Sequence, residues 1–281
     1  MPEKSLVTCD TGLGTTYERW ALTRSLHTLQ GEFALHTVLE GPGDGMTGIC
    51  GLNSLPLGMR GAEVTLWLPE AASQAGVAHQ VWETHAPNAR VHIHTHALTF
   101  PFPYPDSAFD LVWNFNVMPY LAAPQEVLSE MARCSARFVL VFVPNRRNYG
   151  FPLRRLHHKV TGTPWEYGDT RLMQPRIWKQ MFAQAGLRIQ RIFHVDCPWW
   201  PDIINPAALL GDLLPPLKNR LRSASPEQRA RWEAESLPYY NPRAYPDVHR
   251  QMQRLAFFEG LPFALQIPFA HHIGILGQKL P

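Results

Sequence analysis

The stretch TVLEGPGDGMTG, residues 37–48, decides the fold of this chain. A short apolar run ends in an acid, Glu40, and three glycines follow at alternate positions, Gly41, Gly43 and Gly45. Glycine lets the backbone turn with a positive φ and lets a ligand approach it closely. A strand, a glycine turn and the start of a helix form a nucleotide pocket at the carboxyl edge of a parallel sheet. The stretch therefore predicts such a pocket rather than an ordinary strand–loop–helix turn.

Composition and charge indicate which broad class of protein this chain belongs to. The chain has 281 residues, 45% hydrophobic and 17% charged, which is typical of a globular protein with a large core, as one domain with insertions or with a small annex. A net charge of +3 with scattered basic residues does not indicate a nucleic-acid surface. The N-terminus lacks an apolar signal core and no apolar run is long enough to span a bilayer, so we expect a cytoplasmic protein. The four cysteines lack CxxC spacing and predict free thiols.

Apolar runs alternate with helical patterns along the chain. After the first strand, which ends at Glu40, we expect strands over residues 63–68, 90–96, 109–115, 137–145, 187–197 and 271–279. Helices are expected over residues 15–29, 71–83, 125–133 and 174–185, and residues 149–175 are expected to be loop-rich. Continuous apolar strands separated by helices predict a parallel sheet covered on both faces.

The glycine stretch resembles motif I of the class I S-adenosylmethionine-dependent methyltransferases, an acid followed by GxGxG. The segment LTFPFPYPDSAFDLVWNFNVMPYL, residues 98–121, resembles the part of that family that leads into and through the fourth strand. The resemblance covers about residues 16–150. It implies an α/β fold, a three-layer Rossmann-like sandwich with a mostly parallel seven-stranded sheet and an antiparallel last strand. Residues 1–30 would be an N-terminal helical cover, residues 31–197 and 266–281 the core, and residues 198–265 a proline-rich helical insert or lid.

The resemblance also implies a cofactor, S-adenosylmethionine, and a set of residues near it. Glu40 would hold the amino-acid end of the cofactor, the glycine backbone would pass beneath it, and Arg19 could reach its carboxylate. The implied cofactor-binding residues are Tyr17, Glu40, Gly41, Gly43, Asp44, Gly45, Leu68, His96, Ala97, Asn114 and Phe115. For Tyr17, Asn114 and Phe115, simple packing in the core is the alternative.

Two positions depart from the family pattern. Leu68 stands where most members carry an acid for the ribose hydroxyls, and Glu70, the nearest carboxylate, comes two residues later. His96 stands where an Asp often lies near the adenine. Loss of both polar anchors would weaken cofactor binding by about 1–3 kcal/mol each.

Histidines supply the other candidates for chemistry. His92, His94 and His96 alternate on one strand and share a face, but we expect that strand to be internal, and we assign no metal to them. His157 and His158 lie in the loop-rich region and are weak candidates for a general base. His271–His272 is a second adjacent pair.

The insert opens with an apolar segment, CPWWPDIINPAALLGDLLPPLKNRLR, which starts at Cys197 and ends in basic residues. It predicts a lid over the substrate, a helical cap packed on the sheet, or a peripheral membrane contact through residues 199–222. Tyr239, Tyr240 and Tyr245 could line a pocket or pack the proline-rich turns.

Three functions are compatible with these residues. The first is a methyltransferase acting on a small apolar or aromatic molecule. The second is a non-catalytic binding protein with a methyltransferase fold, which Leu68 and His96 favour. The third is a nicotinamide-dependent oxidoreductase, since Gly43, Gly45 and Gly48 also satisfy GxGxxG, although that fingerprint needs an acid after the second strand. The sequence does not give the geometry that would identify a general base. Methyl transfer from a sulfonium needs a base only when the nucleophile carries a proton at the working pH.

Overall fold

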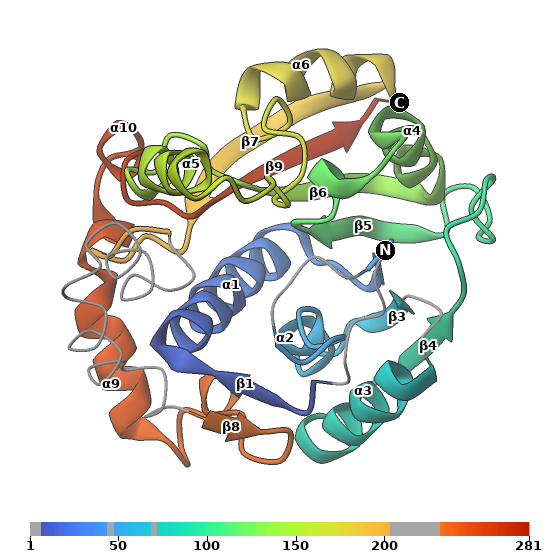
Figure 1. Ribbon diagram of the computed structural model, residues 1–281. Helices are drawn as coiled ribbons and strands as arrows, with labels where there is room; N and C mark the ends of the chain where they lie inside the picture. The colour runs from blue at the N-terminus through green and yellow to red at the C-terminus, as the bar shows by residue number, and fades with distance from the viewer. Residues whose placement is uncertain (1–6, 44–47, 69–71, 203–230, 281) are drawn as a thin grey trace.

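A computed structural model of the chain describes residues 7–43, 48–68, 72–202 and 231–280 (Figure 1). The strands are β1 (Cys9–Thr11), β2 (Thr37–Glu40), β3 (Glu63–Leu68), β4 (Val91–Thr95), β5 (Phe109–Phe115), β6 (Ser135–Pro144), β7 (Leu187–Val195), β8 (Arg231–Glu233) and β9 (His272–Lys279). The helices are α1 (Gly12–Phe33), α2 (Leu55–Gly58), α3 (Ala72–His85), α4 (Pro124–Cys134), α5 (Gly150–Thr161), α6 (Pro175–Gln184), α9 (Pro246–Leu255) and α10 (Phe263–Gln266). Short 3-10 helices are η1 (Met118–Tyr120), η4 (Pro238–Tyr240) and η5 (Ala256–Gly260).

Seven strands form the central sheet, in the order β4-β3-β2-β5-β6-β9-β7. The pairs from β4 to β6 are parallel, and β9 runs antiparallel to both neighbours, β6 and β7. This confirms the predicted seven-stranded sheet with an antiparallel last strand. The chain moves outward from β2 to β4 and then returns to β5 on the other side of β2, so the strand order reverses between β2 and β5. Ligands bind at the carboxyl edge at such a reversal.

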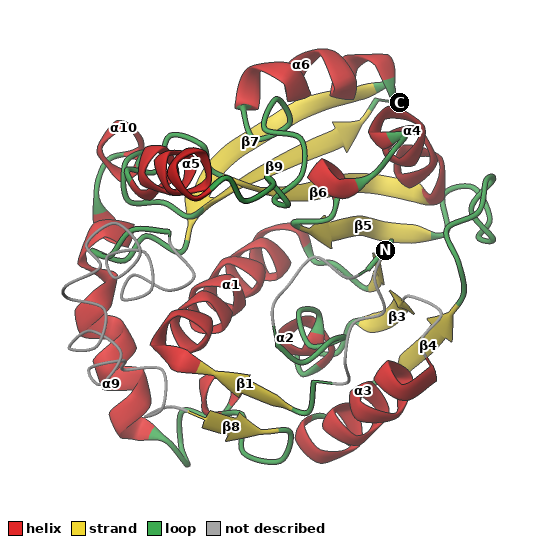
Figure 2. Cartoon of the chain, viewed as in Figure 1, coloured by secondary structure: helices red, strands yellow, loops and turns green. Residues whose placement is uncertain are grey.

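Two apolar layers cover the sheet, because successive strand residues point to opposite faces. Val38 packs with α1, α2 and α3 on one face, whereas Leu39 packs with α4 and α6 on the other. Figure 2 shows α4 and α6 on one side of the sheet and α1, α2 and α3 on the opposite side. The strands are apolar on both faces for this reason, and the sandwich has the predicted three layers.

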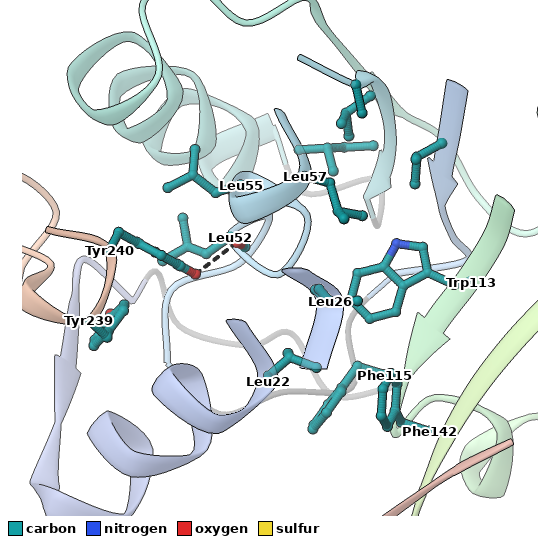
Figure 3. Packing of buried hydrophobic residues seen from close by; sticks show 14 of the residues in the cluster. Leu22, Leu26, Leu52, Leu55, Leu57, Trp113, Phe115, Phe142, Tyr239 and Tyr240 are labelled. Atoms are coloured by element: carbon teal, nitrogen blue, oxygen red, sulfur yellow. Dashed lines mark hydrogen bonds between the residues drawn. The ribbon is translucent and has the colours of Figure 1, made fainter. Parts of the chain in front are cut away.

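Helix α1 extends beyond the predicted range of 15–29 at both ends, covering Gly12–Phe33. Leu22 and Leu26 of this helix are buried against aromatic side chains of the sheet (Figure 3). Trp113 and Phe115 of β5 supply that surface from alternate positions of one strand. The helix therefore lies over the carboxyl half of the central strands, where the predicted cofactor cover belongs.

Two predictions about local structure were wrong. Residues 149–175 are not all loop, because α5 spans Gly150–Thr161 within them. The third predicted strand is β4, and it forms an edge of the sheet instead of an internal position. His92 and His94 project from this edge and are exposed for that reason.

The connection between β7 and β9 holds the predicted insert, of which residues 203–230 lie outside the described residues. Its described part contributes β8, which pairs antiparallel with β1, and then η4, α9, η5 and α10. Met252 of α9 and Tyr239 of η4 join the core on the α1 face. The described part of the insert is thus packed against the N-terminal helix, and the domain boundaries at 30, 197 and 265 stay predictions. None of the described helices is long and apolar enough to cross a membrane.

Candidate cofactor site and its polar surroundings

Glu40 ends β2 at the carboxyl edge of the sheet, beside the reversal of strand order. Its side chain points to the α1 face and is 5% exposed. The next residue, Gly41, donates its backbone N–H to the carbonyl of Trp113 on β5, at 2.8 Å. The acid is therefore fixed between two parallel strands at the position where this type of sheet binds ligands.

Two groups at the start of α2 hold the Glu40 carboxylate. Asn53 Nδ2 donates to Oε1 and the Ser54 backbone N–H donates to Oε2, each at 2.9 Å. Burial raises the pKa of Glu40 above its usual value, while the hydrogen bonds from Ser54 and Asn53 and the charge of Arg19 oppose that rise. A carboxylate accepts about four hydrogen bonds. Glu40 therefore keeps acceptor capacity for a ligand ammonium or hydroxyl group.

Arg19 of α1 connects this carboxylate to the N-terminal strand. Its Nη1 donates to Asn53 Oδ1 at 2.7 Å, and its Nε donates to Asp10 Oδ2 at 3.0 Å. Asp10 also accepts from the Ile49 backbone N–H at 2.7 Å. Burial lowers the pKa of Arg19, but the attraction of Asp10 outweighs it and the pKa is raised. The buried ion pair thus ties β1, α1 and the segment after the glycine turn into one polar network.

The glycine turn lies directly against the end of β3. Gly43 donates its N–H to the Trp67 carbonyl oxygen at 2.9 Å. A Cβ at Gly43 would lie 2.7 Å from that oxygen, and one at Gly41 would lie 2.8 Å from Trp67 Cβ. Only glycine fits these two positions, so the sequence signal has a steric cause. Asp44 and Gly45 lie outside the described residues.

Leu68 occupies the end of β3, where the family pattern has an acid. Its side chain is 2% exposed. One methyl, Cδ2, lies 3.6 Å from an added Cβ at Gly43, and Cδ1 lies 3.6 Å from an added Cβ at Gly51. Leu68 therefore packs apolar surface into the region between the glycine turn and the segment after it. Glu70, the nearest carboxylate, lies outside the described residues.

His96 and Ala97 follow β4 at the same edge. The His96 ring lies against Trp67, with ring centroids 4.6 Å apart, and Trp67 Nε1 donates to the His96 carbonyl at 3.0 Å. His94 interacts with the Tyr104 hydroxyl at 3.2 Å, and His92 with Glu63 at 3.3 Å. Each of these histidines thus has a different partner.

Asn114 and Phe115 of β5 point to opposite faces of the sheet. Asn114 donates through Nδ2 to Met131 Sδ on α4 at 3.5 Å, and no described residue hydrogen-bonds its buried Oδ1. Phe115 lies on the α1 face, with ring centroids 5.2 Å from Phe142 and 4.8 Å from His272. Phe115 therefore lies on the same face as Glu40, while Asn114 does not. Their roles in cofactor binding stay predictions.

The remaining candidate residues from the sequence are Tyr17, His157 and His158. Tyr17 of α1 is fully buried and its hydroxyl lies 3.3 Å from Glu259 Oε1. His157 and His158 lie on α5, where His158 Nδ1 interacts with the Thr163 hydroxyl at 3.0 Å. His158 lines a shallow surface cavity with Trp165.

A second cavity lies between α1 and the insert. Its volume is about 650 Å³, and Tyr239 and Tyr240 of the insert line it together with Trp20 and His249. The Tyr239 hydroxyl donates to Asp10, and the Tyr240 hydroxyl donates to the Leu52 carbonyl at 2.8 Å (Figure 3). Two of the predicted aromatic residues thus form a cavity wall that is hydrogen-bonded to the polar network around Glu40.

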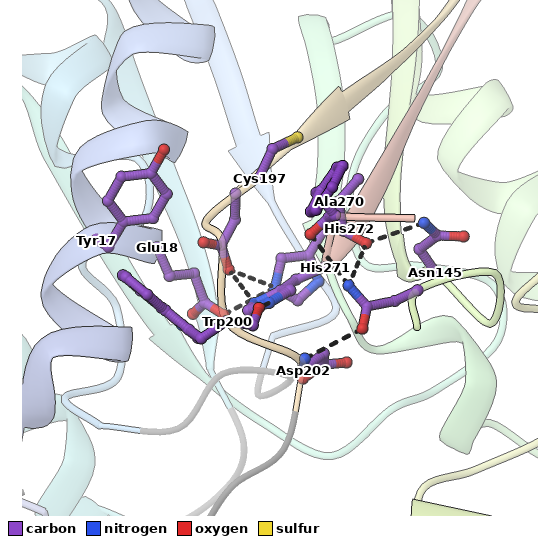
Figure 4. A network of polar contacts seen from close by, with 12 residues as sticks. Tyr17, Glu18, Asn145, Cys197, Trp200, Asp202, Ala270, His271 and His272 are labelled. Atoms are coloured by element: carbon purple, nitrogen blue, oxygen red, sulfur yellow. Dashed lines mark hydrogen bonds and ion pairs between the residues drawn. The ribbon is translucent and has the colours of Figure 1, made fainter. Parts of the chain in front are cut away.

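A second polar cluster lies at the carboxyl edge beyond β5, and we call it the His272 cluster: Glu18, Asn116, Asp196, His271 and His272. Figure 4 labels Glu18, His271 and His272 of this cluster. Burial lowers the pKa of His271, but Asp196 outweighs it and the pKa is raised to about 9. The sequence showed only the adjacent histidine pair. Glu18 and Asp196 carry no local signal, since Glu18 lies 254 residues from its partner His272.

Comparisons with known proteins agree with this geometry. Residues 54–137 match a family model described as "Methyltransferase domain". The matched segment runs from α2 to the start of β6 and does not include the glycine turn. A search of curated proteins found no match.

Several solved structures share the fold. Magnesium protoporphyrin IX methyltransferase from Synechocystis, solved with bound SAH, is 15% identical, with 68% of this chain and 85% of that chain covered and a TM-score of 0.50. A putative methyltransferase from Bacillus halodurans is 13% identical, with 92% and 100% covered and a TM-score of 0.50. The cyclase SpnF is 16% identical, with 92% and 80% covered and a TM-score of 0.50. The chain thus has the Rossmann-like fold of these solved structures, and its residues 54–137 match the methyltransferase-domain model.

Proposed function

We propose that the protein is an S-adenosylmethionine-dependent methyltransferase acting on a small apolar or aromatic molecule. The observation that carries the proposal is Glu40, a buried carboxylate with spare acceptor capacity, placed beside a glycine turn at the reversal of strand order. The family match over residues 54–137 supports the same chemistry. When bound, the cofactor supplies a methyl group activated by its sulfonium.

The described residues fit the methionine end of that cofactor better than its ribose. Glu40 can accept from an ammonium group, and the side-chain-free backbone of Gly41 and Gly43 allows close approach. At the ribose position Leu68 offers no hydrogen bond and is packed between Gly43 and Gly51. Cofactor affinity therefore depends strongly on Glu40, because Leu68 stands where the family has the carboxylate that binds the ribose.

The protein's own contribution to catalysis would be orientation and exclusion of water. Helix α1 covers the central strands, and its Arg19 holds Asn53, which in turn fixes the Glu40 carboxylate. Phe115 presents an apolar ring on the same face. A fixed, dry site lowers the barrier of a displacement mainly by aligning the reacting atoms.

The acceptor site that we propose is the cavity lined by Trp20, Tyr239 and Tyr240. Its volume of about 650 Å³ is within the range of small-molecule sites, and aromatic walls suit an apolar or aromatic acceptor. Peripheral membrane contact through residues 199–222 is also proposed. Of that segment Trp199 is 61% exposed, while residues 203–222 lie outside the described residues.

Calorimetric titration of the full chain tests the cofactor. We expect S-adenosylmethionine and S-adenosylhomocysteine to bind, and NAD not to bind. Glu40→Ala should weaken binding of both at least tenfold, about 1.4 kcal/mol, because a charge-assisted hydrogen bond is lost. Glu40→Gln, which keeps the side-chain shape, should have the same direction of effect.

Glu63→Ala is the matched control. Glu63 begins β3 at the opposite edge of the sheet and its side chain is 38% exposed, so its loss should leave cofactor affinity unchanged. Equal affinities of the wild type, Glu40→Ala and Glu63→Ala proteins would contradict the assignment of Glu40.

A second function, a binding protein with this fold and no turnover, is favoured by the packing of Leu68. It predicts that titration shows no binding of S-adenosylmethionine, or binding without methyl transfer in an acceptor screen. The nicotinamide alternative is disfavoured by the antiparallel β9 between β6 and β7, since dinucleotide-binding sheets of the Rossmann type are mostly parallel.

A further inference from the structure

The His272 cluster brings together side chains from four separate parts of the fold. Asn116 follows β5, Asp196 follows β7, and His272 begins β9. Because β9 is antiparallel, its first residue lies at the carboxyl edge, beside Pro144 of β6 and Val195 of β7. Glu18 reaches this point from α1, and Figure 4 shows its carboxylate directed toward His272.

Three of these side chains offer one ligand atom each at short range. His272 Nε2 lies 2.8 Å from Glu18 Oε2 and 3.6 Å from Asp196 Oδ2, and all three atoms lie within 4.8 Å of one another. A cation bound at about 2.1 Å to each ligand separates neighbouring ligands by about 3.0–3.4 Å. The observed distances lie on both sides of that range, so small side-chain rotations would complete the site.

An unpaired buried oxygen points independently to a ligand. Asp196 is 2% exposed, and its Oδ1 has no hydrogen-bond partner among the described residues. The same carboxyl group places Oδ2 at 2.9 Å from His271 Nδ1, so Oδ1 also lies at the cluster. Buried carboxylate oxygens are normally hydrogen-bonded or bound to a cation.

The surroundings of His272 can prepare its Nε2 for coordination. Asn116 is 8% exposed and its Nδ2 lies 3.1 Å from His272 Nδ1, while its Oδ1 has no partner in the part of the chain that the structure describes. Rotation of this amide by a half turn would present Oδ1 to an Nδ1–H group, which leaves Nε2 with a free lone pair. A side chain that accepts from the far nitrogen is the usual support of a histidine ligand.

Protonation of the two histidines explains the cluster less completely than a bound cation does. Charged His271 and His272 would balance Asp196 and Glu18 through the contacts at 2.9 and 2.8 Å. That arrangement still leaves Asp196 Oδ1 unpaired. A cation between the two carboxylates would balance their charge, and it would also give Oδ1 a partner if Asp196 binds it through both oxygens.

We propose that Glu18, Asp196 and His272 bind a divalent transition-metal ion, Zn²⁺ or Mn²⁺, at the carboxyl edge of the sheet. One imidazole and two carboxylates suit these ions better than Mg²⁺ or Ca²⁺, which prefer oxygen ligands alone. His271 positions Asp196, since its Nδ1 holds Oδ2 while its Nε2 interacts with the Trp200 carbonyl at 3.1 Å. Three protein ligands leave a coordination position for water or for an oxygen of a bound molecule.

The site is connected to solvent and to the proposed cofactor site through α1. The Glu18 side chain is 16% exposed, which provides a path for the ion. The next residue, Arg19, belongs to the network around Glu40. The helix therefore carries, at consecutive positions, a ligand of the metal site and a support of the Glu40 site.

The test uses the untagged full-length chain, stripped with a chelator and titrated calorimetrically with Zn²⁺ and separately with Mn²⁺. We expect one ion per chain. Co²⁺ as an optical probe should give visible absorption bands of a His- and carboxylate-bound ion. Glu18→Gln and His272→Gln should each weaken the site by about 100-fold or more, because each replaces a ligand, and loss of a group that only supports a ligand already costs about 10–100-fold. The titration and the Co²⁺ spectra do not require S-adenosylmethionine, so their outcomes are independent of methyltransferase activity.

The matched controls are Glu63→Gln and His92→Gln. Glu63 and His92 form an exposed pair of the same residue types, 3.3 Å apart, and their exchange should not change the stoichiometry or affinity. Circular dichroism would establish that Glu18→Gln, whose side chain is at the rim of the cluster, is folded. The proposal is overturned if no ion binds stoichiometrically, or if the site persists in folded Glu18→Gln and His272→Gln proteins.

Discussion

Replacement of Asp10 by alanine is a sharp test of how the N-terminal segment supports the site. Asp10 is fully buried and faces Arg19, which is 1% exposed. The substitution removes the acceptor of the Arg19 Nε–H, the Ile49 N–H and the Tyr239 hydroxyl. It removes the Asp10 carboxylate from beside a guanidinium charge in the protein interior. Removing one partner of a buried ion pair costs about 3–5 kcal/mol, a large share of the 5–15 kcal/mol that stabilises a typical domain.

The assay is urea unfolding followed by circular dichroism, with Glu32→Ala as the control. Glu32 also forms an ion pair with an arginine, Arg191, at 2.5 Å, but both side chains are more than one third exposed. Such a pair contributes about 0–1 kcal/mol. A loss for Asp10→Ala no greater than the loss for Glu32→Ala would refute the role of burial in this argument.

A double-mutant cycle separates the charge from the packing. When Arg19→Met is added to Asp10→Ala, the buried guanidinium that Asp10 faces is also removed, so the double variant should lose less stability than the sum of the two single variants. Strict additivity would mean that the two side chains do not depend on each other. Because Arg19 also holds Asn53, Asp10→Ala should weaken binding of S-adenosylmethionine as well.

Two further predictions concern the glycine turn and the thiols. Gly43→Ala should destabilise by about 1–3 kcal/mol in the same urea assay, because its Cβ would lie 2.7 Å from the Trp67 carbonyl, whereas Gly76→Ala in the open interior of α3 should stabilise by about 0.5–1 kcal/mol. Equal effects would show that the turn can relax away from β3. Burial raises the pKa of Cys134 to about 11, so at pH 8 iodoacetamide should label Cys9 and leave Cys134 unmodified in mass spectra of the native protein. Labelling of both thiols at the same rate would contradict the buried placement of Cys134.

Much of the sheet could be predicted because its signals are local. The runs that became β3 and β5 are apolar at most of the positions that two helical layers cover, and their observed bounds match the predicted ones. Gly41 and Gly43 were recognisable because no other residue fits beside Trp67. Helix α5 was missed because Gly150 and Pro152 in its first turn are typical of a loop, although Leu153, Leu156 and Val160 recur at helical spacing.

In the candidate site, too, some features could be predicted from the sequence and others could not. The sequence placed Glu40 at a strand end but gave no account of its partners, Asn53 and Ser54, which the chain brings back thirteen and fourteen residues later. Likewise, the edge position of β4 follows from the order in which strands pair, and a single strand carries no information about its neighbours.

The sequence by itself determined the class of fold, the acid at the end of β2 and the glycine turn, because each depends on residues that are adjacent in the chain. Tertiary structure alone decided which polar side chains meet. Glu18 and His272 are 254 residues apart, and they come within 2.8 Å only because β9 returns antiparallel to the carboxyl edge beneath α1. Contacts at such separation depend on the packing of whole elements, and no local pattern of residues encodes them.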